Sequence, residues 1–447
     1  MTGEWKTVRL GDLTTWASGG TPPKANPIFW NGDIPWISAS SMKTPLLCNS
    51  DLKITKEGLE NGSRLAETNS ILLLVRGSEL HKRIPIGIAT RPVAFNQDVK
   101  ALNVCGEMRS DYLFYWLLGN ETMLLGKVEH TGIGAGKLDT QVLKNLSLAL
   151  PPLAEQKAIA SILGALDDKI ELNRRMNATL EGMARALFQS WFVDFDPVRA
   201  KLDGRKPEGM DKATAALFPD AFEESSLGPV PKGWTIRALA DVIDVKHGFA
   251  FEGKYFSDER CGDILLTPGN FAIGGGFKDA KVKYYTGPVP EDYILCDHDL
   301  VLTMTDLSKA ADTLGYPAMI PPPPMGYRYL HNQRLGKVHI TQSNAATPLF
   351  LYRLFCSEAY RHEILAGATG TTVKHTSPTR IRAFKSLFPS AGVLEVFEKQ
   401  LNIWYLLATQ NESQSRTLAT LRDTLLPKLL SGELSVAHST ITKGDKL

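Results

Sequence analysis

The stretch that decides the fold is Trp5-x4-Leu10-Gly11-Asp12-Leu13, because the same pattern returns as Trp234-x4-Leu239-Ala240-Asp241-Val242. The two patterns lie 229 residues apart. The apolar run Ile71-Leu72-Leu73 has a counterpart, Leu300-Val301-Leu302, at the same distance. A register held over such a length indicates an internal duplication. The chain is therefore predicted to contain two copies of one structural unit.

The register shifts later in the chain. Matched positions then lie 238 residues apart: Thr131 and Thr369, Pro151 and Pro389, Asn173 and Asn411, Leu180 and Leu418, Leu187 and Leu425. This difference predicts insertions in the second copy, near the run Pro321-Pro322-Pro323-Pro324. Four prolines cannot join the interior of a sheet, so we expect a stiff loop there.

Each copy begins with about 150 residues of mixed character. Ile71–Val75 and Leu300–Leu302 are predicted to be buried strands, while Tyr112–Leu118 and Phe350–Phe355 are predicted to be short amphipathic helices. Loops rich in glycine and threonine separate these segments. The expected fold class is α+β, with two globular mixed α/β domains in tandem.

A long helix is predicted after each globular part, once Pro151-Pro152 or Pro389 has interrupted the chain. Apolar residues recur there at alternating steps of three and four, which is the pattern of a coiled coil. We expect the two helices to pack as an antiparallel coiled coil. The predicted seam consists of Ile159, Leu166, Asn173, Leu180, Leu187 and Trp191 in the first helix, and of Trp404, Asn411, Leu418 and Leu425 in the second.

Asparagine occupies the same seam position in both helices, at Asn173 and Asn411. One interpretation is a buried asparagine contact, which costs stability but fixes register. The other is that both side chains face solvent or a partner. Seam residues such as Trp191 are expected to be exposed in the isolated chain, which would make it depend on a partner for stability. A helix over residues 154–192 would measure roughly 55–60 Å, longer than one turn of duplex DNA.

Composition limits the classes of protein that the chain can belong to. Of its 447 residues, 43% are hydrophobic and 22% are charged, which is typical of globular domains. The net charge of +2 neither indicates nor excludes binding to nucleic acid. The five scattered cysteines form no CxxC pair, so we expect reduced thiols, no metal site and a cytoplasmic location. The first ten residues do not form a signal peptide, and no apolar run is long enough to cross a membrane.

Motifs for catalysis are missing from the sequence. Asn26-Pro27-Ile28-Phe29 lacks the second proline that the loop of an amino-methyltransferase would need. Gly132-Ile133-Gly134-Ala135-Gly136 has neither the preceding strand nor the later acidic residue of a nucleotide-binding site. The chain has no Walker lysine motif, and His362-Glu363 has no second histidine at zinc-protease spacing. We therefore expect no catalytic residues.

The ends of the first long helix carry a family resemblance. It opens with Pro151-Pro152-Leu153-Ala154-Glu155-Gln156-Lys157 and closes with Trp191-Phe192-Val193-Asp194-Phe195-Asp196-Pro197. A connector follows, then Leu227-Gly228-Pro229-Val230-Pro231-Lys232-Gly233-Trp234, and the second helix ends in Leu425-Leu426-Pro427-Lys428-Leu429-Leu430. These motifs closely resemble the specificity subunit of type I restriction-modification systems, over essentially the whole chain. The second helix departs from them, because it opens with Pro389-Ser390-Ala391-Gly392.

The resemblance implies a role in reading DNA. Each globular part would be a target-recognition domain that reads one half of a bipartite, asymmetric site in double-stranded DNA. The helices would span the unread gap and dock two adenine-specific methyltransferase subunits, which restriction subunits would join. S-adenosylmethionine, ATP and Mg²⁺ would be bound by those partners and not by this chain. The implied layout is residues 1–152 and 226–390 as recognition domains, 153–193 and 391–432 as helices, 194–225 as connector and 433–447 as tail.

Polar loop residues are the candidates for contacts with DNA, because arginine, lysine, serine and threonine bind base edges and phosphates. The candidates are Arg76, Ser78, Lys82, Arg83 and Lys137 in the first domain, and Lys246, Lys309, Thr371 and Lys374 in the second. For any one of them, the alternative is an ordinary solvated side chain. Asn96-Gln97 and Asn332-Gln333 recur in both copies, so we interpret them as structural turns.

Two other functions remain open at this point. The chain could be a degenerate methyltransferase, which binding of S-adenosylmethionine to the isolated chain would favour. It could also be a coiled-coil scaffold that binds proteins and not DNA. A DNA-specificity subunit differs from both, because it binds DNA and confers methylation only together with a methyltransferase subunit.

Overall fold

A computed structural model describes residues 5–131, 134–226, 228–279, 282–308, 310–371 and 373–436. The chain divides into two compact units. The first unit contains residues 1–173 and 413–447, and the second contains residues 174–412. The boundary between the units falls inside both long helices, so each unit holds one globular domain and a part of each helix.

The first unit is built around a five-stranded sheet. Its strand order is β2 (Thr14–Ser18), β11 (Val99–Val104), β7 (Ile71–Leu74), β9 (Ile86–Ala89) and β4 (Leu46–Leu47). Neighbouring strands are antiparallel except for β4 and β9, which are parallel. All four side chains of β7 are buried, as expected for a central strand that is covered on both faces. The predicted strand at Ile71–Val75 is therefore confirmed.

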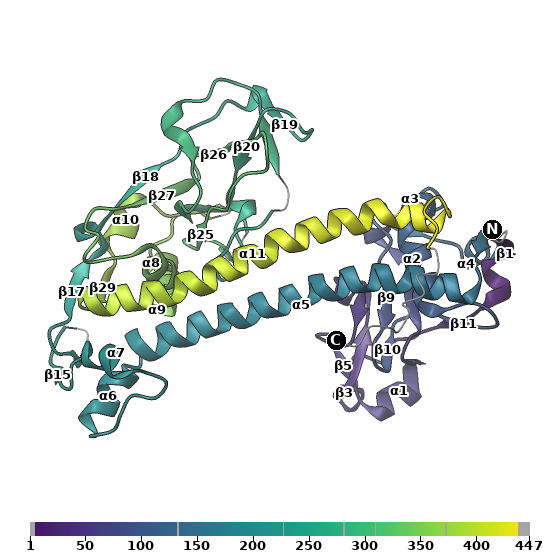
Figure 1. Ribbon diagram of the computed structural model, residues 1–447, viewed down its shortest axis with the longest axis horizontal. Helices are drawn as coiled ribbons and strands as arrows, with labels where there is room; N and C mark the ends of the chain where they lie inside the picture. The colour runs from purple at the N-terminus through teal and green to yellow at the C-terminus, as the bar shows by residue number, and fades with distance from the viewer. Residues whose placement is uncertain are drawn as a thin grey trace, which may run out of the picture. The chain divides into compact units, whose positions relative to one another are not determined.

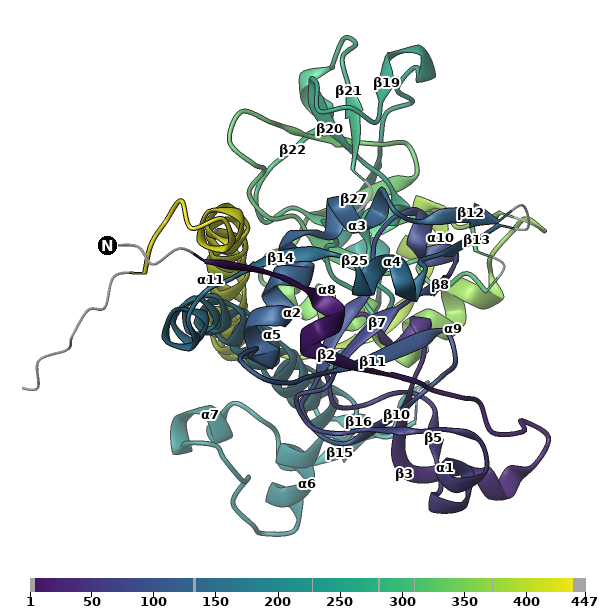
Figure 2. The ribbon, with the colours of Figure 1, turned by 90° about the vertical axis from the view of Figure 1, so that its right-hand side faces the viewer.

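A second sheet in this unit lies beside α1 (Lys56–Gly62), as Figure 2 shows. Its order is β5 (Lys53–Ile54), β3 (Trp30–Ile37), β10 (Val93–Phe95) and β6 (Leu65–Ala66). The entry strand β1 (Lys6–Arg9) pairs with β14 (Ser147–Leu150), which directly precedes the long helix. The short helices are α2 (Ser110–Gly119), α3 (Glu121–Leu125) and α4 (Thr140–Lys144).

The globular domain of the second unit repeats both sheets. Its first sheet has the order β18 (Ile243–His247), β27 (Leu335–Ile340), β23 (Leu300–Thr303) and β25 (Pro317–Met319). Its second sheet has the order β19 (Phe256–Ser257), β21 (Lys283–Tyr285), β20 (Asp263–Leu266), β26 (Tyr329–His331) and β22 (Ile294–Leu295). The entry strand β17 (Thr235–Ala238) pairs with β29 (Lys385–Phe388) in the same way as β1 with β14. The predicted duplication is confirmed, and only β4 of the first copy and β19 of the second lack a counterpart in these sheets.

The strand registers locate the insertions in the second copy. Gly87 of β9 pairs with Leu72, and Ala318 of β25 pairs with Val301. The offset, which is the number of residues between equivalent positions of the two copies, has therefore risen from 229 at Val301 to 231 at Ala318. Lys100 pairs with Leu73 while Gly336 pairs with Leu302, which sets the offset at 236 after the proline loop. At β14 and β29 it is 238. The proline loop therefore accounts for the largest of three steps, and not for the whole difference.

In each copy, one position must be glycine because the backbone of the first sheet passes close to that of the second. A Cβ added to Gly19 would overlap the carbonyl oxygen of Phe95, and one added to Gly248 would overlap that of Asn332. The residue after each glycine donates its backbone N–H to the second sheet, from Gly20 to Phe95 O and from Phe249 to His331 O. Any side chain at these glycines would separate the two sheets.

The predicted short helices are α2 and α8 (Pro348–Phe355), but neither has the solvent-exposed face of a surface helix. Tyr112–Leu117 of α2 and Leu349–Phe355 of α8 are buried without interruption. The reason is that each helix lies between its sheet and the long helices: α2 contacts β9, and a Cβ on Gly119 would meet Leu426 and Leu430. Helix α8 is followed by α9 (Glu358–Ala366) and α10 (Pro378–Ala383).

The two predicted long helices are α5 (Leu153–Phe192) and α11 (Ala391–Leu430), each of 40 residues (Figure 1). Within the first unit they run antiparallel, since Asp167 binds Arg422 while Asn173 binds Gln414 and Ser415. Within the second unit Asn177 binds the carbonyl of Ala408, and Phe188 stacks against Phe397, which is also antiparallel. The expected fold class, with mixed α/β domains and an antiparallel helix pair, is confirmed. None of the described helices is long and apolar enough to cross a membrane.

The seam asparagines are buried, and the solvent-facing interpretation is wrong. Asn173 is 1% exposed and Asn411 is 5% exposed. The side-chain amide of Asn411 donates to Oδ1 of Asn177 at 2.9 Å, and Asn177 donates to Ala408 O at 3.0 Å. A buried contact between asparagines therefore exists within the second unit.

The expectation that Trp191 is exposed is also wrong. It is 7% exposed and packs against Phe218 and Phe397, with ring centroids 5.0 and 5.8 Å apart. Phe218 belongs to the connector, which holds α6 (Asp196–Leu202), α7 (Lys212–Ala216) and β15 (Phe222–Glu223). Strand β15 pairs with β16 (Val230–Pro231) at the start of the second domain. The sequence pattern of the helix could not show that its end is covered by the connector. The argument from Trp191 for instability without a partner therefore fails.

Candidate nucleic-acid interface

Several of the candidate residues meet on a small ribbon in the first domain. Strand β8 (Arg76–Gly77) continues the buried strand β7 and pairs with β13 (Ala135–Lys137), which pairs with β12 (Glu129–Thr131). The register places Arg76 opposite Lys137, and Lys137 opposite Glu129. Two loops that are about sixty residues apart in the sequence therefore present one row of charged side chains. We call these three strands the first ribbon.

The second domain forms the equivalent structure, which we call the second ribbon. It consists of β24 (Thr305–Asp306) and β28 (Lys374–His375). Thr305 lies opposite His375, and Asp306 lies opposite Lys374. A further bridge joins His375 to Thr369. Thr305 therefore corresponds to Arg76, and His375 corresponds to Lys137.

Three candidates in the first domain are available for a ligand. Arg76, Ser78 and Lys82 are exposed, and their side chains have no hydrogen bond or ion pair within the described ranges. The side chain of Arg83 is half-buried and donates to the carbonyl of Met42 at 3.0 Å, so it has a structural role. Lys137 lies 3.8 Å from Glu129 and 3.7 Å from Asp139, and both carboxylates offset its charge.

Two candidates in the second domain also have side chains that are available for a ligand. Thr371 is exposed and Lys374 is half-buried, and neither side chain has a partner among the residues that the structure describes. Lys246 is held by structure instead, since it donates to Asp292 O at 2.8 Å and lies 4.6 Å from the centre of the Tyr293 ring. Lys309 lies outside the described residues.

The first ribbon holds two like charges opposite one another. Arg76 and Lys137 are direct partners on adjacent antiparallel strands. Glu129 and Asp139 offset the charge of Lys137, whereas the guanidinium of Arg76 has no carboxylate partner among the described residues and can bind an anion. A phosphate of the DNA backbone is an anion of this kind. The arrangement thus favours a role for Arg76 in binding phosphate or a base edge.

A buried carboxylate that sequence reasoning missed holds the second ribbon in shape. Asp306 is 5% exposed and accepts hydrogen bonds from Ser308 N at 2.6 Å and from Thr313 N and Oγ1 at 2.5 and 2.7 Å. Burial alone would raise the pKa of Asp306, but the donors at Thr313 and Ser308 outweigh it and lower the pKa. The signal in the sequence was the Asp-x-Ser pattern of an Asx turn. The equivalent position in the first ribbon is Gly77.

The recurring Asn-Gln pairs form turns, as predicted. Asn96 and Asn332 are both 8% exposed, and each backbone carbonyl accepts from the residue three positions later, Val99 or Leu335. The side chain of Asn332 also accepts from the N–H of Arg334. These contacts close the connection into β11 and β27. The two asparagines are therefore structural.

All ten predicted seam residues are covered within the chain. Ile159, Asn173, Trp191 and Asn411 are buried, and Leu166, Leu180, Leu187, Trp404, Leu418 and Leu425 are half-buried. Asn173, Asn411 and Trp191 contact the other long helix. The assignment of the whole set to one seam, and its role in docking a partner, stays a prediction. Apolar side chains with no cover lie on other faces of the helices: Ile162, Leu172 and Met183 in α5, and Ile403, Leu406 and Leu421 in α11.

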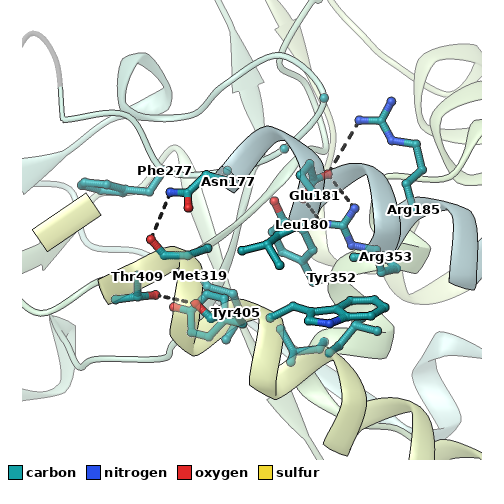
Figure 3. A pocket seen from close by; sticks show the side chains of 18 of the residues that line it. Asn177, Leu180, Glu181, Arg185, Phe277, Met319, Tyr352, Arg353, Tyr405 and Thr409 are labelled. Atoms are coloured by element: carbon teal, nitrogen blue, oxygen red, sulfur yellow. Dashed lines mark hydrogen bonds and ion pairs between the residues drawn. The ribbon is translucent and has the colours of Figure 1, made fainter. Parts of the chain in front are cut away.

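A pocket of about 410 Å³ lies within the second unit, between α5, α8, α11 and the loop Gly274–Gly276 (Figure 3). The half-buried Trp404 and Tyr405 of α11 form part of its wall. Arg353 of α8 reaches Glu181 of α5 through both terminal nitrogens, each at 2.6 Å. Burial would lower the pKa of Arg353, but Glu181 reverses this and raises it. This side of the pocket is therefore closed by a charge pair internal to the protein.

The geometry alone defines a class of protein. It is a tandem of two domains on one pair of helices, in which the scaffold is repeated and the exposed ribbons differ. Residues 2–182 match the family model of the type I restriction modification DNA specificity domain. These residues therefore carry a type I restriction modification DNA specificity domain, and the chain as a whole is similar to type I restriction enzyme specificity subunits.

Relatives are similar over most of their length. The type I restriction enzyme MjaIX specificity subunit of Methanocaldococcus jannaschii is 24% identical, over 97% of this chain and 94% of that protein. The HindI specificity subunit of Haemophilus influenzae is 27% identical, over 72% of this chain and 77% of that protein. Among solved structures, the S subunit of a type I restriction-modification system from M. genitalium superposes with a TM-score of 0.56 at 14% identity, covering 96% of this chain and 97% of that one. This last likeness concerns the fold alone.

Proposed function

We propose that this chain is the non-catalytic DNA-specificity subunit of a type I restriction-modification complex. In this role it recognises a bipartite, asymmetric site in double-stranded DNA. Each globular domain reads one half of the site, mainly through its ribbon and the adjacent loops. The chain positions two methyltransferase subunits, and restriction subunits join this core.

The observation that carries the proposal is the contrast between scaffold and ribbon. Both domains share the order of their sheets and the pairing of their entry strands. At equivalent ribbon positions, however, Arg76 and Lys137 of the first domain are replaced by Thr305 and His375. Thr305 is 5% exposed and lies 3.1 Å from the ring of His375, so the exposed groups at these positions are guanidinium and ammonium in one domain and imidazole in the other. Two domains of one fold with different polar rows suit a site whose two halves differ in sequence.

The helices suit the roles of spacer and docking surface. Helix α5 continues without a break for 40 residues, so its length is fixed by its hydrogen bonds and not by a flexible linker. The seam side chains are covered inside the chain, so we assign docking to the exposed apolar side chains of the outer faces. They include Leu172 and Met183 of α5 and Ile403 and Leu421 of α11. Exposed apolar side chains gathered along one element are typical of protein interfaces.

The chemistry is assigned to the partners. We propose that the methyltransferase subunits bind S-adenosylmethionine and that the restriction subunits use ATP and Mg²⁺. The complex would act in the cytoplasm, where its DNA substrate is found. This chain would contribute recognition and geometry only.

The experiment combines the chain with the methyltransferase subunit of the same system. Methylated adenines should appear at one bipartite site when both proteins and S-adenosylmethionine are present. Neither protein alone should produce them. A matched variant, Arg76→Ala with Lys374→Ala, should bind the same DNA less tightly in a gel-shift assay. Methylation by the isolated chain would contradict the proposal, and so would a complex that binds all sequences equally.

A further inference from the structure

Two equivalent residues join the recognition domains to the helices. Tyr115 lies on α2 and Arg353 lies on α8, at positions 238 residues apart, which is the register of the duplication in this region. Both are buried, at 5% and 7% exposure. Each binds a carboxylate on α5 within its own unit. The side chains differ in chemistry, but the connection from domain to helix is the same.

In the second unit the connection is a two-pronged ion pair. Both terminal nitrogens of Arg353 lie 2.6 Å from an oxygen of Glu181 (Figure 3). The guanidinium also lies 4.6 Å from the centre of the Tyr352 ring. Arg185 approaches the same carboxylate from the solvent side at 3.7 Å. A planar fork of this kind is satisfied in one relative orientation only.

In the first unit the connection runs through three elements. The hydroxyl of Tyr115 donates to Oδ2 of Asp167 at 2.9 Å. The other oxygen of Asp167 accepts from Arg422 of α11 at 2.7 Å. Asp167 therefore links the domain, α5 and α11 at one point. Burial together with the Asp167 charge raises the pKa of Tyr115, so the phenol stays protonated and able to donate.

The contacts of Arg353 with Glu181 and of Tyr115 with Asp167 suit a role in fixing the orientation of each domain better than a role in adding stability. A buried ion pair adds little net stability, because desolvation of its charges offsets their attraction. It does select one geometry, since any other orientation leaves a buried charge without its partner. The other contacts between α8 and α11 are the backbone N–H of Leu349, which donates to Glu398 at 3.1 Å, and apolar packing such as Phe350 against Phe397, so Arg353 provides the side-chain fork from α8 to α5. Apolar contacts are non-directional and tolerate small rotations.

We propose that Tyr115 and Arg353 are positioning residues, which fix the orientation of each recognition domain on its helices and thereby the gap between the half-sites that the complex accepts. This inference rests on the proposed function. A domain that can rotate on its helices would accept half-sites one base pair nearer or farther. A domain held by the fork would accept one gap.

The test replaces the ion pair by apolar side chains of similar size, Arg353→Met with Glu181→Leu, in the complex with the methyltransferase subunit. Adenine methylation is then measured on DNA substrates whose two half-sites are separated by the natural gap or by one base pair more or less. The preference for the natural gap should fall by about two- to thirtyfold, the usual range for coupling carried by such networks. The matched control is Arg185→Ala, which removes only the exposed partner of Glu181 and should keep the preference.

Tyr115→Phe provides the second variant, since it removes one hydroxyl and leaves the packing intact. It should reduce the preference for the natural gap in the same direction. A purely structural role would lower methylation at all gaps equally, so an unchanged preference in both variants would overturn the inference. Failure of the proposed function would look different, because the unaltered complex would then show no bipartite site at all.

Discussion

The first and second ribbons occupy the same place in two copies of one domain, but they are built for different contacts. The first presents Arg76 opposite Lys137, and Glu129 and Asp139 offset the charge of Lys137. The second presents the hydroxyl of Thr305 at 3.1 Å, hydrogen-bond distance, from Nδ1 of His375. The difference indicates that the scaffold constrains where a contact is made and leaves its chemistry free to change.

Some structural features are present in both copies, and we expect a substitution in them to affect recognition of both half-sites. They include the glycines at which the sheets approach, the entry strands and the two long helices. The ribbons belong to one copy each. Alterations in shared parts should therefore act on the whole site, and alterations in a ribbon should act on one half of it.

The largest effect is expected from the helices. Seven residues inserted into α5 after Asp168 would lengthen it by about 10 Å, while α11 stays unchanged. Pairs such as Asp167 with Arg422 and Asn177 with Ala408 could not both form in their present register. We expect methylation at the natural gap to be abolished, as measured by sequencing of modified adenines. Seven residues inserted after the exposed Gly204 of the connector should leave the gap unchanged, and an unchanged gap in both insertions would contradict a spacer role.

A large effect confined to the second copy is expected from Asp306→Ala. The substitution removes three hydrogen bonds to a buried carboxylate, so it should lower the free energy of unfolding by about 3 to 5 kcal/mol. Chemical denaturation monitored by hydrogen exchange would measure the loss of free energy of unfolding separately in each of the two units. The control is Asp312→Ala, an exposed carboxylate in the same loop. Equal destabilisation of both units would show that the second ribbon does not depend on Asp306.

The stability of the two copies should also differ in its dependence on pH. His331 of β26 is 1% exposed, and burial lowers its pKa to about 4, whereas the first copy has Phe95 at this position. Between pH 4 and 6.5 the unfolded chain binds a proton that the folded chain does not, so stability is lost as the pH falls through this window. The full effect corresponds to about 3 kcal/mol. His331→Gln should weaken the pH dependence in the second unit, while His339→Gln, at an exposed position, should leave it unchanged.

The smallest effect is expected from single ribbon side chains. Arg76→Ala should weaken binding to the natural site by about 1 to 3 kcal/mol if Arg76 binds a base edge, and should reduce the salt dependence if it binds phosphate. Fluorescence anisotropy of the complex at several salt concentrations separates these outcomes. Arg83→Ala should have little effect on affinity, since its guanidinium binds the protein's own Met42 carbonyl. An equal loss of binding affinity in both variants would show that Arg76 makes no specific contact with DNA.

The sequence predicts much of the scaffold because local patterns carry it. The buried strand at Ile71–Leu74 and the two long helices follow from runs and spacings of apolar residues. The duplication follows from matched positions such as Trp5 and Trp234. These features need no knowledge of which segments meet in space.

The site depends on contacts between distant segments, and for this reason less of it could be predicted. Arg76 and Lys137 were separate candidates until the strand register placed them opposite one another. The burial of Trp191 depends on the connector, and the pairing of Arg353 with Glu181 depends on where α8 meets α5. Spacing within a segment carries no information about such encounters.

The most direct test of the two-part account is the set of adenines modified in cells that carry this chain and its methyltransferase subunit. Single-molecule sequencing should give a site with two different halves at one fixed gap. Arg76→Ala should relax or weaken recognition of one half, and Lys374→Ala should do so for the other half only. A continuous or symmetric site, or one in which either substitution changes both halves alike, would contradict the account.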